Sequence, residues 1–373
     1  MSLKLKLSIC FITISLIFSL MVIGVWASRN VEINIGGSVS YEVEYNVLEG
    51  FTFSNTAVAS YSGSETNVVI PSSYSTVVVD GETLYIEGDD YTVRSVGSRA
   101  FYQNTTITAV TLPSTITSIG SSAFYECSNL QSINFPSNLT TIGSSAFNGC
   151  SSLQEINLPS RLTSIGTGAF YECSSLQSLT LPSRLTTIGQ SAFGWCSSLS
   201  GNLTIPSSVT SIALWAFTAT NISSVTFANN SNLTDMGMAI FMACTNLTSV
   251  DFGDSNSITE LGTNTFQDCT RLQTVDLGLN SKITGIPSCM FCRCTRLRQV
   301  YNIPDTIETI GLNSFQDCSS LTLLDFENPS ISWEVCDEED FSTDIITITA
   351  SEFSGNYITL LSDTYRLYYW RRV

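Results

Sequence analysis

The sequence predicts a β-rich solenoid, because one short phrase recurs at a nearly constant interval along most of its 373 residues. Ten phenylalanines mark the interval, separated by 23 residues at first and by 24 or 25 residues later. A fixed period of roughly 20–50 residues is typical of chains in which each unit buries its apolar face only against the next unit. The ten residues are Phe101, Phe124, Phe147, Phe170, Phe193, Phe217, Phe241, Phe266, Phe291 and Phe315.

The unit between residues 130 and 150 shows what each residue type contributes to one coil. Leu130, Ile133 and Phe135 predict a short strand. Pro136 ends that strand, because proline has no amide hydrogen to donate to a sheet. Gly143 then permits a turn that a residue with a Cβ would resist. The next phenylalanine fills the interior, and a cysteine closes the unit before the following strand.

The repeated phrase resembles the BspA-like, or treponemal-type, leucine-rich-repeat proteins, whose units read L-x-x-L-x-L-P-x-x-L-x-x-I-G-x-x-A-F-x-x-C. The match extends from about Val93 to Leu324. The resemblance implies a leucine-rich-repeat right-handed superhelix of about ten coils of 23–25 residues, with short parallel strands and caps at both ends. Caps are needed because the end coils of a stack otherwise expose core and strand edges.

The later coils depart from the phrase. Thr220 replaces the cysteine, and Ala213 stands where glycine is expected. We expect these coils to be less regular and their loops to be more exposed. Extra residues occur near Gly201, Asn230, Ser255, Leu279 and Asn302.

The chain is expected to divide into four segments. Residues 1–27 read as a signal peptide, with Lys4 and Lys6, an apolar run to Val25, and cleavage after Ala27. The apolar run is long enough that an uncleaved signal anchor is the alternative, and it would be the protein's only contact with a membrane. Either form makes the protein secreted or displayed at the cell surface. The other segments are an acidic β-rich N-terminal segment and lead-in (28–66), the leucine-rich-repeat solenoid (67–330) and a C-terminal cap (331–373).

The composition argues against several classes of function. A formal charge of −17 with few clustered basic residues argues against nucleic-acid binding. The chain has no histidine, which removes Ser-His-Asp and Cys-His catalysis and every histidine-bearing metal site. We therefore predict no enzyme, no metal and no cofactor. An enzyme acting on carbohydrate through carboxylates such as Asp251 and Asp276 is the remote alternative.

The cysteines predict a buried column. Eight of them share one position of the repeat, where a cysteine behaves as a small buried hydrophobe, so we expect a reduced ladder; disulfides, usual in secreted chains, are the alternative. Cys289, Cys292 and Cys294 form a C-x-x-C-x-C phrase that could be a zinc site, a redox pair, or two turn residues beside a ladder residue. The ladder comprises Cys127, Cys150, Cys173, Cys196, Cys244, Cys269, Cys294 and Cys318.

The residues between the apolar positions of each strand predict an exposed face. Repeat-built faces of this kind generally serve as extended docking surfaces. Arg298 and Tyr301 stand at its later end and are residue types enriched in binding hot spots. A second column, Asp268, Arg293 and Asp317, should form a surface charge ladder. The candidate binding residues are Asn134, Asn157, Thr180, Thr204, Thr226, Asp251, Asp276, Arg298, Tyr301 and Asp325.

We therefore predict a non-enzymatic, extracellular or cell-surface module that binds a protein or a surface glycan through this face. The family resemblance adds adhesins and surface antigens as the expected roles. The alternative is a structural spacer or envelope component without a discrete ligand.

Overall fold

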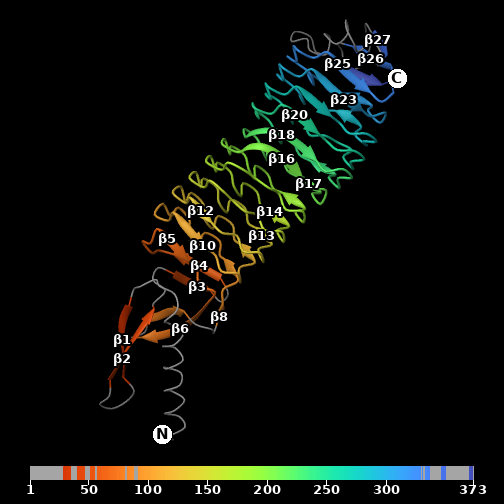
Figure 1. Cartoon of the computed structure of the whole chain (residues 1–373). Coiled ribbons are helices and arrows are strands. Elements are labelled where there is room, and N and C mark those ends of the chain that lie inside the picture. Colours follow the sequence, from red (N-terminus) through yellow and green to blue (C-terminus); the bar gives the residue numbers. More distant parts are fainter. Residues whose placement is uncertain are drawn as a thin grey trace.

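The computed structural model describes strands Ser28–Asn34, Ser40–Asn46 and Phe51–Ser54, residues 57–79, Glu82–Glu87, 91–328, 330, 332–336, 346–349 and 369–372. Over these residues the chain winds into a parallel β-solenoid of about ten coils without a helix, which confirms the predicted fold (Figure 1). The described part therefore holds no helix long and apolar enough to cross a membrane. The predicted signal peptide or anchor, residues 1–27, lies outside the described residues.

The longest sheet arises where the sequence predicted no strand. In most coils the two residues before the repeat glycine, usually Ser-Ile or Thr-Ile, form a two-residue strand, and neighbouring coils pair in parallel register, as Ile142 does with Ile165. So short a strand leaves no alternating pattern in the sequence and exists only because the next coil pairs with it. In order, the sheet contains β19 (Asp235–Met236), β17 (Ser211–Ile212), β15 (Thr187–Ile188), β14 (Ser164–Ile165), β13 (Thr141–Ile142), β11 (Ser118–Ile119), β9 (Ser95–Val96), β4 (Ala57–Tyr61) and β3 (Phe51–Ser54).

The predicted strand face consists of two shorter sheets. The first runs β12 (Ser132–Ile133), β10 (Ala109–Thr111) and β5 (Asn67–Val69). The second runs β16 (Ser200–Ile205), β18 (Asn221–Phe227), β20 (Ser249–Asp251), β21 (Thr274–Asp276), β23 (Gln299–Ile303) and β25 (Leu323–Phe326). Between them, residues 153–158 and 176–181 form no strand, so the expectation of a strand in every coil is wrong there. Isolated backbone hydrogen bonds still join these coils. Gln177 N donates to Gln154 O (3.0 Å), and Ser200 N donates to Gln177 O (3.0 Å).

The later coils carry the longer strands, although we expected them to be the less regular ones. Their extra residues form local bulges in the strands. The pairing of β16 with β18 shifts register between Gly201 and Asn202, and that of β23 with β25 shifts between Val300 and Ile303. Gly201, Asn230 and Ser255 take up left-handed backbone conformations, with φ of +84°, +53° and +52°. One added residue therefore bends the chain out of the ladder without breaking the strand pairing on either side.

Additional strands lie at both ends of the stack. At the N-terminal end β3 pairs antiparallel with β4, and the fully buried Val58 pairs with Val96 of the next coil. Nearby are the hairpin of β1 (Ser28–Asn34) and β2 (Ser40–Asn46), and the sheet of β7 (Glu82–Glu87), β6 (Ser73–Val79) and β8 (Tyr91–Thr92). At the other end, the sheet order is β22 (Gly285–Ile286), β24 (Thr309–Ile310), β28 (Tyr369–Arg372), β26 (Ser332–Cys336) and β27 (Ile346–Thr349). The segment limits at residues 66 and 330 remain predictions.

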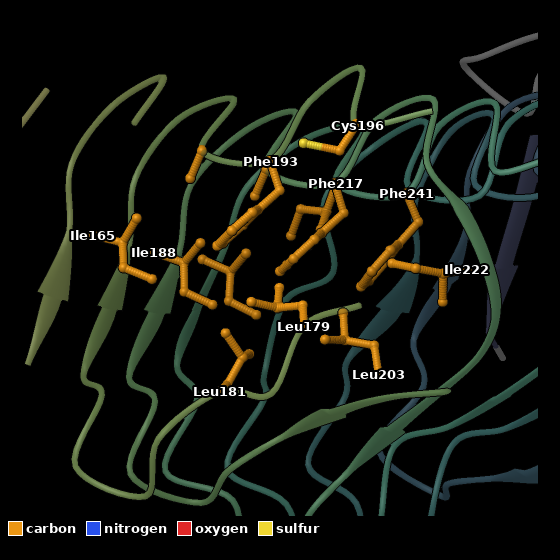
Figure 2. Close-up of a cluster of buried hydrophobic side chains, with 14 of the residues drawn as sticks. Ile165, Leu179, Leu181, Ile188, Phe193, Cys196, Leu203, Phe217, Ile222 and Phe241 are labelled. Atoms are coloured by element: carbon orange, nitrogen blue, oxygen red, sulfur yellow. The ribbon is translucent and has the colours of Figure 1, made fainter. Parts of the chain in front are cut away.

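The phenylalanines form the continuous centre of the core. All ten are at most 1% exposed, including Phe315 in the last coil. Successive rings stack with centroids 4.8 Å apart at Phe101–Phe124 and 5.8 Å apart at Phe266–Phe291. Figure 2 shows Phe193, Phe217 and Phe241 as parallel plates, with the isoleucines of the long sheet to one side. The predicted aromatic plugs are therefore confirmed.

Gly143 is needed for a different reason from the predicted turn. Gly143 does not have a positive φ. A Cβ on it would lie 2.7 Å from Ser121 N and 2.8 Å from Gly120 C of the preceding coil. The left-handed conformations fall on turn residues such as Ser122 and Glu126, at φ of +55° and +53°. The glycines at this position of successive coils therefore mark close approaches between coils. This glycine column comprises Gly97, Gly120, Gly143, Gly166 and Gly189.

This close approach predicts the effect of a single methyl group. A Cβ on Gly189 would lie 2.5 Å from backbone atoms of both Gly166 and Thr167, so Gly189→Ala must push two coils apart. We expect Gly189→Ala to lower the free energy of unfolding by about 3 kcal/mol, measured by urea denaturation. Gly201→Ala is the matched control, since Gly201 has no atom within 4 Å of the added Cβ and only its φ of +84° opposes the change. A cost of about 1 kcal/mol is expected there; equal costs would contradict the close-approach explanation.

Candidate functional site

The candidate residues lie along one side of the stack in successive coils. Register places Thr204 beside Thr226, Thr226 beside Asp251, Asp251 beside Asp276, and Asp276 beside Tyr301. The strand pairing does not extend this column beyond Tyr301. The register shift after Val300 separates Tyr301 from Asp325. Asp276 and Tyr301 are half-buried, and the other eight candidates are exposed: Asn134, Asn157, Thr180, Thr204, Thr226, Asp251, Arg298 and Asp325.

Several of these side chains are engaged by the protein's own backbone. The Asn134 side chain accepts a hydrogen bond from Leu112 N (2.7 Å) and donates one to Leu112 O (3.0 Å). It therefore completes the ladder to the preceding coil. Such a residue holds the stack together, and a ligand would have to displace it in order to use its amide.

The two aspartates of the column cap the ends of their strands. Asp251 Oδ1 accepts a hydrogen bond from Gly253 N (2.8 Å), and Asp276 Oδ1 accepts one from Gly278 N (2.9 Å). Asn302 Nδ2 also donates to Asp276, at 2.7 Å. These bonds anchor the carboxylates where two like charges stand in neighbouring coils. Among the described residues no group of three histidine, cysteine, aspartate or glutamate side chains is arranged to hold a metal ion.

Arg298 and Tyr301 differ from the other candidate residues. The Arg298 backbone is tied to both neighbouring coils, through its N to Gln273 O (2.8 Å) and from Thr322 N to its O (2.9 Å). Its side chain is nevertheless exposed. Tyr301 lies on β23, half-buried, with its hydroxyl bonded to the Gln299 side chain. A rigid backbone thus presents a guanidinium and an aromatic ring three residues apart.

The predicted charge ladder is confirmed for its first pair. Arg293 binds Asp268 through two parallel bonds, Nε to Oδ1 at 2.5 Å and Nη2 to Oδ2 at 2.7 Å. The hydrogen bonds that Arg293 donates lower the pKa of Asp268, and the same bonds raise the pKa of Arg293. Asp317, the third predicted member, adds a smaller electrostatic contribution that also raises the pKa of Arg293. The pair's side chains are 46% and 34% exposed, so it stabilises the fold by at most about 1 kcal/mol.

The cysteine ladder is buried and its thiols are bonded to the backbone. Cys127 Sγ donates to Phe101 O at 2.9 Å, and Cys173 Sγ donates to Phe147 O at 3.2 Å. The same bond to the phenylalanine carbonyl of an earlier coil recurs for Cys150, Cys196, Cys244, Cys269, Cys294 and Cys318. Burial raises the pKa of Cys196 to about 12 and that of Cys244 to about 11. These thiols therefore serve as structural donors and are poorly suited to act as nucleophiles.

The structure also shows exposed aromatic residues that the sequence analysis did not single out. On the turns that follow the glycine column, Trp195 is 54% exposed and Trp215 is 40% exposed. Tyr102 and Tyr125 stack there at 5.0 Å, and the Arg99 guanidinium lies 5.4 Å from the Tyr102 ring. A comparison of the repeats could have found them, because tryptophan stands where other coils carry serine, glycine or glutamate.

The fold and the exposed strand face define a leucine-rich-repeat protein. The family model described as "BspA type Leucine rich repeat region (6 copies)" matches residues 89–200 and 199–322, which is more than half of the chain. The chain therefore belongs to the BspA-type leucine-rich-repeat family, as the repeated phrase indicated. No curated protein matches the chain in sequence.

Several solved structures are similar to this chain. A leucine-rich cell surface protein from Faecalibacterium prausnitzii is 22% identical, with 79% of this chain and 96% of that chain covered and a TM-score of 0.39. A leucine-rich repeat protein from Bacteroides ovatus is 24% identical, with 73% and 79% covered and a TM-score of 0.42. The pneumococcal vaccine antigen PcpA is 21% identical, with 81% and 80% covered and a TM-score of 0.44. These are likenesses of fold.

Proposed function

We propose that this protein is a non-enzymatic binding module, secreted or displayed at the cell surface, that holds a protein partner on its strand face. The observation that carries the proposal is the contrast within that face. Asn134, Asp251 and Asp276 use their side chains on the protein's own backbone, whereas Arg298 is exposed on a backbone fixed from both sides. A backbone that is already rigid needs no ordering when a partner binds, and arginine and tyrosine are residue types enriched among binding anchors.

The same contrast argues against chemistry at this face. The Asp251 and Asp276 carboxylates are held by strand-capping hydrogen bonds, and the ladder thiols are buried against carbonyl groups. Nothing in this arrangement resembles a general acid paired with a base. Binding is therefore the better proposal, and the remote alternative of a carbohydrate-cleaving enzyme has no support from the geometry.

The proposal is tested by affinity capture. The mature protein, immobilised through its C-terminus, is exposed to surface proteins from its natural surroundings. We expect one or more of them to be retained, and Arg298→Ala and Tyr301→Ala each to weaken the affinity at least tenfold, the range of a binding hot spot (about 1.4 kcal/mol or more). Thr180→Ala is the matched control, since Thr180 occupies the repeat position of Tyr301 in an early coil and is exposed.

Three outcomes separate the alternatives. Undiminished capture by Arg298→Ala and Tyr301→Ala removes this patch from the proposal. Capture of a glycan in place of a protein contradicts the proposed class of partner. If the intact protein captures nothing, the result favours a spacer or envelope component. Asn134, whose side chain bonds to the backbone of the preceding coil, suits such a role.

A further inference from the structure

One coil carries two cysteines outside the buried ladder, across a single tight turn. Cys289 is partly exposed, and Cys292 is 1% exposed. The Cys292 backbone N donates to Cys289 O at 3.2 Å, which closes the turn between them. Their positions in the repeat are two residues before and one residue after Phe291.

The same two positions bring side chains into contact in other coils. Before and after Phe101 they hold Arg99 and Tyr102, with the guanidinium 5.4 Å from the ring centroid. Before and after Phe266 they hold Asn264 and Gln267, whose side chains are hydrogen-bonded to each other. The repeat thus makes these positions neighbours across the turn, and in the Phe291 coil both neighbours are thiols. Burial is the largest cause that raises the pKa of Cys292, and the neighbouring Cys289 raises it further, as expected for two interacting thiols.

The surroundings of this pair differ from those of the ladder. Cys292 is as buried as the ladder cysteines, which are at most 1% exposed, but its neighbour Cys289 is partly exposed. Each ladder thiol donates to a phenylalanine carbonyl of an earlier coil. Cys292 instead donates to Asn313 O, at 3.1 Å, in the following coil. That carbonyl also accepts a bond from Gln316 N at 3.1 Å, so it keeps a donor if the Cys292 thiol loses its hydrogen.

We propose that Cys289 and Cys292 form a reversible disulfide across this turn by exchange with a low-molecular-weight disulfide, while the eight ladder thiols stay reduced. The more exposed Cys289 attacks first as its thiolate, forms a mixed disulfide with one half of the reagent and releases the other half as a thiolate. Cys292, after losing its proton to solvent, then attacks the Cys289 sulfur and releases the second thiolate. The two cysteine sulfurs are oxidised, and the reagent is reduced to two thiols.

The sequence around the pair makes the test direct. Lys282 and Arg293 flank it, so trypsin releases residues 283–293 with Cys289 and Cys292 together and leaves Cys294 on the next peptide. The reduced, full-length protein is incubated at pH 8 with oxidised glutathione, denatured in excess alkylating reagent and digested. We expect the 283–293 peptide to appear unalkylated and two hydrogens lighter, and the ladder peptides, including that of Cys294, to be fully alkylated. Reduction before alkylation should restore two alkylated cysteines to the 283–293 peptide.

Cys289→Ser is the matched variant, because Ser122, Ser145 and Ser191 occupy the same position with a left-handed backbone in other coils. In this variant Cys292 should be fully alkylated, and the circular dichroism spectrum should be unchanged. Two results would overturn the proposal: alkylation of both cysteines in the 283–293 peptide, or a persistent glutathione adduct on Cys289. Oxidation of the ladder cysteines to the same extent would overturn the claimed selectivity. The outcome is independent of any ligand on the strand face.

Discussion

Raising the pH from 8 to 10 under reducing conditions should markedly lower the free energy of unfolding of the solenoid. Burial raises the pKa of the ladder thiols from the ordinary value of 9.0, to about 11 for Cys244 and about 12 for Cys127 and Cys196. A thiol that is neutral in the folded chain stabilises it fully below pH 9. That contribution is lost as the pH rises from 9 towards the raised value, because the unfolded chain then releases the proton first.

The size of the effect follows from the number of thiols. Each one removes about 1.4 kcal/mol per pH unit above its unfolded pKa. Eight together therefore approach the whole stability of an ordinary domain, about 5–15 kcal/mol, within one or two units. Urea denaturation at pH 8, 9 and 10 in the presence of a reductant measures the loss.

A single substitution in the ladder provides the control. Thr220 already occupies the ladder position in one coil, where its hydroxyl donates to Phe217 O at 3.0 Å. Cys196→Thr should therefore fold, and its loss of stability between pH 8 and 10 should be smaller than that of the parent chain by about 1.4 kcal/mol. A free energy of unfolding that stays flat up to pH 10 would show that ladder burial does not control the alkaline limit.

The second large effect is expected from removing one aromatic plug. Phe193 is fully buried and stacks on Phe170 at 5.3 Å and on Phe217 at 5.4 Å, so Phe193→Ala opens a cavity in contact with both neighbouring coils. We expect the free energy of unfolding to fall by about 3–5 kcal/mol. Because each coil is stabilised mainly by its neighbours, the unfolding transition should also separate into two steps, one for each side of the gap.

Trp195→Ala, two residues along the same turn, is the matched control. Trp195 is 54% exposed, and the equivalent positions in the next two coils already carry Ala219 and Ala243 with the same left-handed backbone. A change within about 0.5 kcal/mol is expected for it. Urea denaturation followed by circular dichroism compares the two variants. A loss of less than about 1 kcal/mol for Phe193→Ala would contradict the stacked core.

The repeat allowed the interior to be predicted almost completely. The ten phenylalanines and eight ladder cysteines lie inside as the period indicated, since residues at one position of successive coils share one environment. Three features escaped the pattern. The longest sheet is built mostly from two-residue strands, the glycine column is needed for coil contact, and residues 153–158 and 176–181 form no strand. Each depends on bonds between coils that the pattern within a single coil does not specify.

The candidate site was predictable in position only. Spacing alone placed Thr226, Asp251 and Asp276 in one column, because side chains at one position of a parallel stack follow one another. Spacing could not show that the Asn134 side chain is bonded to Leu112 of the preceding coil, since that partner is set by the close packing of the coils. Nor could it show that Asp251 and Asp276 accept local hydrogen bonds from Gly253 N and Gly278 N at the ends of their own strands.

The sequence by itself determined that this protein is a BspA-type stack of coils with phenylalanine and cysteine inside, because periodicity records which side chains face the core. The tertiary structure alone decided which polar side chains the protein uses for itself and which ones, such as Arg298, it leaves exposed. The physical reason is that hydrogen bonds between coils join residues about one period apart, and their geometry depends on how closely the coils approach.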